Sequence, residues 1–160
     1  KKIRKMSKYD VNIYTDGSSA PNPGLGGFGI VMEKVGTDYV KEFSQAFRHT
    51  TNNRMELLGV IVSLEKLKKK ASVLITSDSK YVIDSVVKGW VFNWERTNFK
   101  DKKNPDLWKR FLEVYRKHDV EFKWVKGHNS HPQNERCDVL ATTAYLNGVL
   151  IDEYYEKNNG

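Results

Sequence analysis

The period of the apolar residues changes at Asn52, and this change most constrains the fold. Before it, apolar and polar residues alternate over 9–15, and the segments FGIVMEKV and YVKEFSQAF predict two further strands joined by a hairpin at 36–38. Over 52–70 apolar residues recur at helical spacing, with Asn53 and Glu56 as a predicted capping pair. We therefore expect an antiparallel meander followed by a helix.

The rest of the chain alternates helices with short strands. SVLITSD is a nearly continuous apolar run, typical of a strand covered on both faces, and VEFKWVKG predicts a last strand. Helices are predicted over 79–88, 105–117 and 134–146. Strands separated by helices pair in parallel, so the pattern predicts an α/β domain with a mixed sheet.

Length and charge narrow the possible classes of protein. The 160 residues fit one domain at 9–148, with a basic flexible arm at 1–8 and a C-terminal tail at 149–160. No apolar run approaches the ~20 residues of a membrane span, and no apolar segment marks a secretory signal. The single cysteine indicates a reducing, cytoplasmic setting. The net charge of +7 favours a polyanionic partner.

Two predicted strands end on acids, Asp16 in NIYTDGSS and Asp78 in VLITSDSK. Sites in open α/β sheets form beyond the carboxyl ends of the strands, so these side chains would meet if the strands are neighbours. A structural role is the alternative, because Asp16-Gly17 suits a turn and Asp78 suits a helix N-cap.

Two further acids, Glu56 one turn into the first helix and Asp138 in the first turn of the last, can face the same end of the sheet. Each alone also fits an acid near a helix start. Four carboxylates in one cleft repel one another unless divalent cations bind, and Mg²⁺ and Mn²⁺ prefer such oxygen ligands.

Four stretches in this order resemble the bacterial form of the type 1 ribonucleases H: YTDGSSAPNPGLGGFG, TTNNRMEL, TSDSKYV and WVKGHNSHPQNERCDVLA. The resemblance covers roughly 9–146. It implies a five-stranded mixed sheet, with the first three strands antiparallel and helices on both faces. It also implies a monomeric endonuclease, without an obligate protein partner, that hydrolyses the RNA strand of RNA–DNA hybrids.

Residue roles follow from the same resemblance. Asp16, Glu56, Asp78 and Asp138 match the family's metal-binding acids, which hold two Mg²⁺ ions (Mn²⁺ may substitute) about 4 Å apart around the scissile phosphate. The products carry a 5′-phosphate and a 3′-hydroxyl. His128 matches a mobile histidine that assists catalysis, and His131 is assigned a structural role.

The predicted substrate contacts lie in three regions. Polar side chains near the cut would meet the RNA strand, two residues would grip a DNA phosphate, and the basic segment 88–110 would line a channel for the DNA strand. Turn, cap or amphipathic-helix chemistry is the alternative for each. The candidates are Asn22, Thr51, Asn52, Asn53, Lys80, Trp90 and Asn104.

Three rival functions remain. A hybrid-binding module that does not cut is disfavoured by the intact acids. A ribonuclease H domain from a larger polymerase, such as a reverse transcriptase, is disfavoured because the motif GHNSHPQNERCD resembles that of free-standing bacterial members. An integrase-like or junction-resolving nuclease is disfavoured by NNRMEL.

Overall fold

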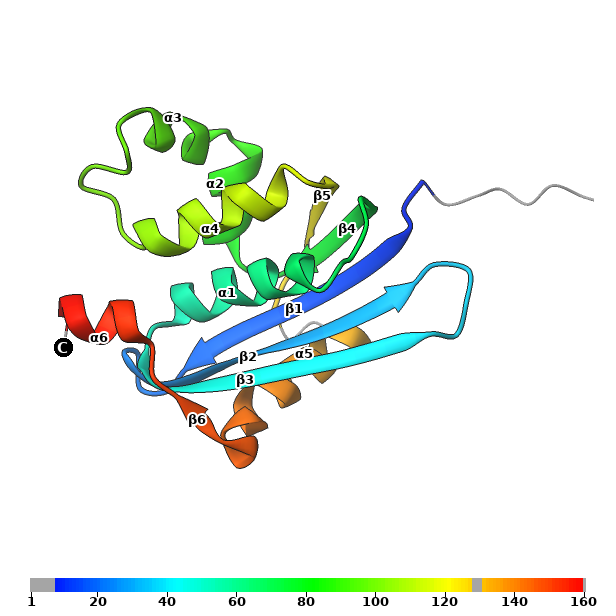
Figure 1. The fold of residues 1–160 in the computed structure, drawn as a ribbon. Helices are drawn as coiled ribbons and strands as arrows, with labels where there is room; N and C mark the ends of the chain where they lie inside the picture. Colours follow the sequence, from blue (N-terminus) through cyan, green and yellow to red (C-terminus); the bar gives the residue numbers. More distant parts are fainter. Residues whose placement is uncertain (1–7, 128–130, 160) are drawn as a thin grey trace, which may run out of the picture.

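A computed structural model describes residues 8–127 and 131–159. Its centre is a mixed sheet with the strand order β5-β4-β1-β2-β3-β6 (Figure 1). The strands are β1 Val11–Ser19, β2 Gly24–Lys34, β3 Val40–Thr50, β4 Ser72–Ser77, β5 Asp119–Trp124 and β6 Val149–Leu150.

Strand directions confirm the predicted mixed sheet. β1, β2 and β3 form an antiparallel meander, and β4 and β5 add to it in parallel. The described sheet has six strands rather than five, because β6 pairs in parallel with β3 through residues 46–47 and 149–150. The first and fourth strands are neighbours, with Tyr14 opposite Thr76, so the condition for the two strand-end acids to meet is fulfilled.

Helices cover both faces of the sheet, with α1 and α4 on one face and α5 on the other (Figure 1). Adjacent residues of β2 serve the two faces: Phe28 lies next to Gly59 of α1, whereas a Cβ at Gly29 would collide with the carbonyl of Cys137 in α5. The helices are α1 Asn52–Glu65, α2 Lys80–Val87, α3 Trp90–Arg96, α4 Pro105–Tyr115, α5 Pro132–Thr143 and α6 Glu153–Asn159, with a 3₁₀ turn at Ala144–Asn147.

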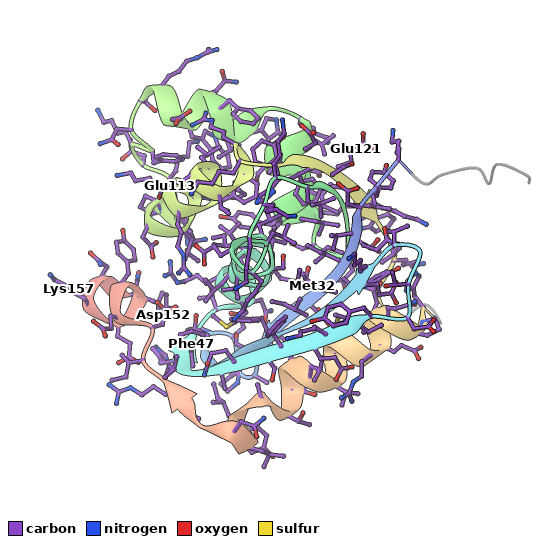
Figure 2. The ribbon with its side chains drawn as sticks, turned by 45° about the vertical axis from the view of Figure 1, so that its right-hand side comes forward. Met32, Phe47, Glu113, Glu121, Asp152 and Lys157 are labelled. Atoms are coloured by element: carbon purple, nitrogen blue, oxygen red, sulfur yellow. The ribbon has the colours of Figure 1, made fainter. Side chains whose placement is uncertain are left out.

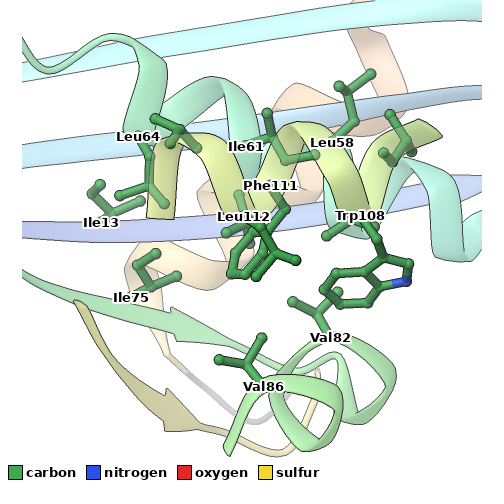
Figure 3. Close-up of a cluster of buried hydrophobic side chains, with 14 of the residues drawn as sticks. Ile13, Leu58, Ile61, Leu64, Ile75, Val82, Val86, Trp108, Phe111 and Leu112 are labelled. Carbon is green, nitrogen blue, oxygen red and sulfur yellow. The ribbon is translucent and has the colours of Figure 1, made fainter. Parts of the chain in front are cut away.

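The main core lies between α1, α2, α4 and the sheet (Figure 3). Ile13 and Ile75 from neighbouring strands belong to the same hydrophobic cluster as the α4 residues Trp108 and Phe111, and all four are fully buried. Trp108 keeps its polar atom satisfied because Nε1 donates to the Tyr81 hydroxyl at 2.8 Å. This core fixes the position of α1 over β1, on which the site depends.

The predicted cap of the first helix is wrong, and the alternative role of Asp78 as a helix N-cap is excluded as well. Thr51, not Asn53, caps α1, and its hydroxyl accepts a hydrogen bond from the Arg54 N–H. Ser79, not Asp78, caps α2 through the Val82 N–H. Ser and Thr hydroxyls compete well with carboxylates for this role, so the Asp78 carboxylate remains available for another partner.

The C-terminal segment does not continue as a free tail after residue 148. Asp152 is buried at the junction of α6 and β3, where it accepts hydrogen bonds from Thr50 and Arg54, each at 2.7 Å. Glu156 forms an ion pair with Arg48 of β3 at 2.8 Å. Figure 2 shows Asp152 at this junction and Lys157 on the outer side of α6. No described helix has the length and hydropathy needed to cross a bilayer.

Candidate active site

β1 and β4 lie side by side, with Asp16 inside β1 near its carboxyl end and Asp78 directly after β4. The first strand does not end on Asp16 as predicted, because it stays paired with β2 as far as Ser19. Helix α1 adds Glu56, because Gly17 lets the helix backbone come very close to β1: a Cβ at Gly17 would lie 2.5 Å from the Glu56 nitrogen. Carboxylate oxygens of Asp16, Glu56 and Asp78 all lie within 4.8 Å of one another. The topology therefore brings together three acids that are far apart in the sequence.

Asp138 reaches the same place from α5, on the opposite face of the sheet. It lines a narrow cavity together with Asp16 and Asp78, and its charge and a hydrogen bond act on Asp16. The helix begins at Pro132, so Asp138 lies in its second turn rather than in the first turn as predicted. We call Asp16, Glu56, Asp78 and Asp138 the acidic cluster.

Burial and mutual repulsion change the titration of the acidic cluster. Burial, followed by the charges of Asp78 and Asp138, raises the pKa of Asp16 to about 8. Burial, followed by the charges of Asp16 and Asp78, holds the pKa of Glu56 well above its usual range. The metal-free cluster therefore retains protons at neutral pH that a bound cation would displace.

The donor set fits hard divalent cations. Glu56 Oε1 and Asp78 Oδ1 are buried and have no hydrogen-bond donor among the described residues. Buried anionic oxygens of this kind are costly unless they are paired or coordinate a metal. All four members of the acidic cluster offer oxygen, the ligand atom that Mg²⁺ and Mn²⁺ prefer.

The loop before α5 and the first turn of α5 add two residues that were not predicted from the sequence to be part of the site. Gly127 and Asn134 line the narrow cavity with His131. A Cβ at Gly127 would lie 2.7 Å from Asp78 Oδ2, so the loop packs directly on this carboxylate. The position of Gly127 next to the predicted His128 was the available signal. His128 itself lies outside the described residues.

His131 is at the N-cap of α5, and its ring centroid lies 5.6 Å from that of Tyr14. This contact ties the start of α5 to β1 and agrees with a structural role. Its Nδ1 atom and Asn134 Oδ1 are buried without a hydrogen-bond partner among the described residues.

Five of the seven predicted substrate-binding residues line one second cavity of about 580 Å³. Its walls come from the loop after β1, the start of α1, the connection before α4, and α6. We call it the polar cavity. The five residues are Asn22, Thr51, Asn52, Asn53 and Asn104.

Several of these side chains also hold the backbone around the polar cavity. Asn22 Oδ1 accepts from the Asn52 N–H at 3.0 Å, and Asn52 Oδ1 accepts from the Ser19 N–H at 2.6 Å. Asn104, at φ 60°, receives a hydrogen bond from Arg54 and donates one to Tyr81. Turn chemistry and a cavity-lining position therefore coexist in the same residues.

The remaining two candidates do not line the polar cavity. The Lys80 ammonium lies 4.6 Å from the ring centroid of Trp124, whose Nε1 donates to the Asp78 carbonyl. Trp90 is 44% exposed at the start of α3, with the Lys88 ammonium 5.4 Å from its ring centroid. Lys80 is thus near the acidic cluster, and Trp90 is on a separate helical segment.

Comparison with known proteins supplies independent information. The family model described as RNase H matches residues 8–145. The chain is 50% identical over 140 residues to a ribonuclease H of Desulforamulus reducens, covering 84% of this chain and 87% of the relative. It is 44% identical over 153 residues to a ribonuclease HI of a Synechocystis species, covering 92% and 95%.

A solved structure of an RNase H has a similar fold. The crystal structure of LC9-RNase H1, described as a type 1 RNase H with the type 2 active-site motif, superposes with a TM-score of 0.78. That protein is 30% identical, and the match covers 96% of this chain and 82% of that one.

Proposed function

The chain belongs to the RNase H family, and from this premise we propose that it cleaves the RNA strand of RNA–DNA hybrids with two divalent cations held by the acidic cluster. The observation that carries the proposal is the convergence of Asp16, Glu56 and Asp78 within 4.8 Å, two of them with a buried oxygen that has no hydrogen-bond partner among the described residues. Mg²⁺ is the proposed metal, and Mn²⁺ is expected to substitute for it.

Within this proposal each residue has a defined task. Glu56 and Asp78 would hold a cation through buried oxygens that have no hydrogen-bond partner within 8–127 and 131–159, and Asp16 and Asp138 would complete the ligand set from β1 and α5. When bound, the cations supply a nucleophilic water and charge stabilisation at the phosphate. The expected products carry a 5′-phosphate and a 3′-hydroxyl.

The substrate is proposed to lie across both cavities. Asn22, Asn52 and Asn53 would meet the RNA strand near the cut, while Thr51 and Asn104 would hold a phosphate of the DNA strand. Lys80 would meet a phosphate beside Asp78, and Trp90 would line the path of the DNA strand. His128 keeps its predicted role in assisting catalysis. We further infer a cytoplasmic monomer that needs no obligate protein partner.

A module that binds hybrids without cleaving them would not need the acidic cluster. Four carboxylates that repel one another would then cost stability and also weaken binding of a polyanion. The intact cluster thus supports an enzyme. A domain from a longer polymerase remains the second candidate, and it would perform the same reaction.

The test uses an end-labelled RNA–DNA hybrid with Mg²⁺, Mn²⁺ or chelator, beside single-stranded and duplex RNA. We expect metal-dependent cutting of the hybrid's RNA alone, with 5′ ends that accept a new label only after phosphatase treatment. Asp16→Asn should abolish cutting, whereas Asp38→Asn, in the exposed turn between β2 and β3, should not. Hybrid binding without cutting in either metal would refute the proposal.

A further inference from the structure

Helix α6 forms one wall of the polar cavity, although the sequence analysis assigned its residues to a tail. Tyr154, Tyr155, Asn158 and Asn159 line the cavity from this side. The other walls carry the residues that the proposed function assigns to the hybrid. α6 is thus the part of the polar cavity to which neither sequence nor family resemblance assigned a role.

The anchors of α6 explain why these residues face the cavity. Asp152 and Glu156, four residues apart, face the body of the domain, where they pair with Arg54 and Arg48. The ring of Tyr155 lies 5.4 Å from that of His49, between centroids. Tyr154 and Asn158 lie on the opposite side of the helix from Asp152 and Glu156. Tyr155 and Asn159 lie between these two sides, and both pairs line the cavity.

The wall is polar but uncharged at the positions that line the cavity. It presents tyrosine hydroxyls and asparagine amides, while the wall before α4 presents Lys102 and Lys103. Within the described residues neither lysine forms an ion pair with a carboxylate. Arg54, by contrast, is neutralised by Asp106 and Asp152, each at 2.7 Å.

This combination suits a sugar–phosphate backbone. Phosphate oxygens accept hydrogen bonds from Lys, Asn and Tyr side chains, and such contacts set the position of a nucleic acid without reading its sequence. Arg54 keeps the cavity in shape through its own ion pairs. The side-chain amides of Asn158 and Asn159 each donate one N–H to a backbone carbonyl one turn earlier, of Tyr154 and Tyr155, and each keeps a second N–H. These second donors, together with the two lysines, can bind a phosphodiester.

We propose that α6 is a substrate-binding element whose residues Tyr154, Asn158 and Asn159 hold a phosphodiester of the bound hybrid in the polar cavity. This inference rests on the proposed function, because it assumes that the hybrid is the substrate. It assigns α6 to substrate affinity and positioning, and no step of the chemistry to it.

The test introduces a negative charge at the wall. Asn158→Asp and Asn159→Asp are compared with Asn147→Asp, which makes the same charge change at an exposed residue outside the polar cavity. Binding of a fluorescent hybrid is measured in chelator, and cleavage is measured separately with Mg²⁺. We expect the two α6 variants to raise Kd and KM roughly three- to tenfold with kcat unchanged, because the new charge repels a bound phosphate.

Tyr154→Phe provides a variant that keeps the ring beside Arg54, 5.4 Å from its guanidinium, and removes only the hydroxyl. It should raise KM by roughly two- to threefold without lowering the thermal midpoint. The aspartate variants are checked for the same midpoint, so that fraying of α6 is not mistaken for lost binding.

A second arm locates the phosphate. Single uncharged methylphosphonate linkages are placed in turn along the DNA strand or the RNA strand of the hybrid. The rise in Kd caused by Asn158→Asp should disappear when one particular linkage is uncharged. The position of that linkage identifies the strand held in the polar cavity.

The proposal would be overturned if the rise in Kd were the same whichever linkage is uncharged, or if Asn147→Asp raised Kd as much as the α6 variants. In either case the new charge would act only at long range. Failure of the original protein to cut any hybrid would instead refute the proposed function, and the binding measurement in chelator separates the two results.

Discussion

Replacing Asp16 by asparagine should stabilise the metal-free protein at neutral and alkaline pH, although it removes a proposed metal ligand. Burial, followed by the charges of Asp78 and Asp138, raises the pKa of Asp16 from 3.8 to about 8. Ionisation of Asp16 is therefore unfavourable in the folded chain. An amide of nearly the same shape cannot ionise and avoids this cost.

The magnitude follows from linkage between protonation and folding. A carboxyl group whose pKa is higher in the folded protein contributes its full share of stability only below the unfolded pKa. That share is lost as the pH rises from 3.8 to about 8, with a slope of about 1.4 kcal/mol per pH unit and proton. A single proton would account for roughly 4 kcal/mol between about pH 4 and pH 7. Because the acidic cluster shares its protons, we expect a net gain of about 1–3 kcal/mol for the variant at pH 7.

The assay is urea unfolding in chelator across about pH 4 to pH 9 for the original protein, Asp16→Asn and the control Asp38→Asn. The free energy of unfolding of Asp16→Asn, relative to the original protein, should increase with pH and level off above about pH 8. Added Mg²⁺ should reduce the advantage of the variant, because a ligand at 100 times its Kd stabilises the folded state by about 2.7 kcal/mol and the variant binds it less well. A difference that does not depend on pH, or a variant less stable than the original protein in chelator at pH 8, would refute the reasoning.

Three further outcomes are expected. Arg54→Met should lower the free energy of unfolding by about 3–5 kcal/mol in urea titrations, because it leaves two aspartates without their buried partner; a loss below about 1 kcal/mol would contradict this. Gly17→Ala should lower the rate of hybrid cleavage by at least tenfold. The new Cβ would lie 2.5 Å from the Glu56 nitrogen and must displace the start of α1. Cleavage at the original rate would show that the site does not need this close approach of α1 to β1. Burial raises the pKa of the Cys137 thiol, whose Sγ donates to the Tyr14 carbonyl at 3.2 Å, so iodoacetamide should label this cysteine only after unfolding. Mass spectrometry would measure the labelling, and fast labelling of the native protein would show that the thiol is accessible.

Local patterns were enough to predict most of the elements and the acids at or near the carboxyl ends of two strands. Alternation over 9–15 and the apolar run of SVLITSD predicted β1 and β4, but that the two strands are neighbours was only a condition, and β1 continues past Asp16 to Ser19. These features depend on side-chain period and on residues close in the chain, which the sequence displays directly. The same is true of the motifs that carry the family resemblance.

The approach of α1 to β1 was decided by tertiary structure. Gly17 appeared to be a turn residue, whereas the fold uses its missing side chain to admit Glu56 to the acidic cluster. The raised pKa of Asp16 likewise comes from burial and from charges contributed by β4 and α5, residues 62 and 122 positions away in the chain. Neither effect has a local sequence signature, because both depend on distances across the sheet.

The C-terminal segment shows most clearly which features the sequence determines and which depend on tertiary structure. By itself the sequence determined the strands β1 to β5, the helices α1, α2, α4 and α5, and the four acids, since each is set by local period and residue type. Only the tertiary structure decided that 149–150 add a strand to β3 and that α6 closes the polar cavity. A two-residue strand and a seven-residue helix are too short to form alone, and the buried pairing of Asp152 with Arg54 stabilises them only once β3 and α1 are in place.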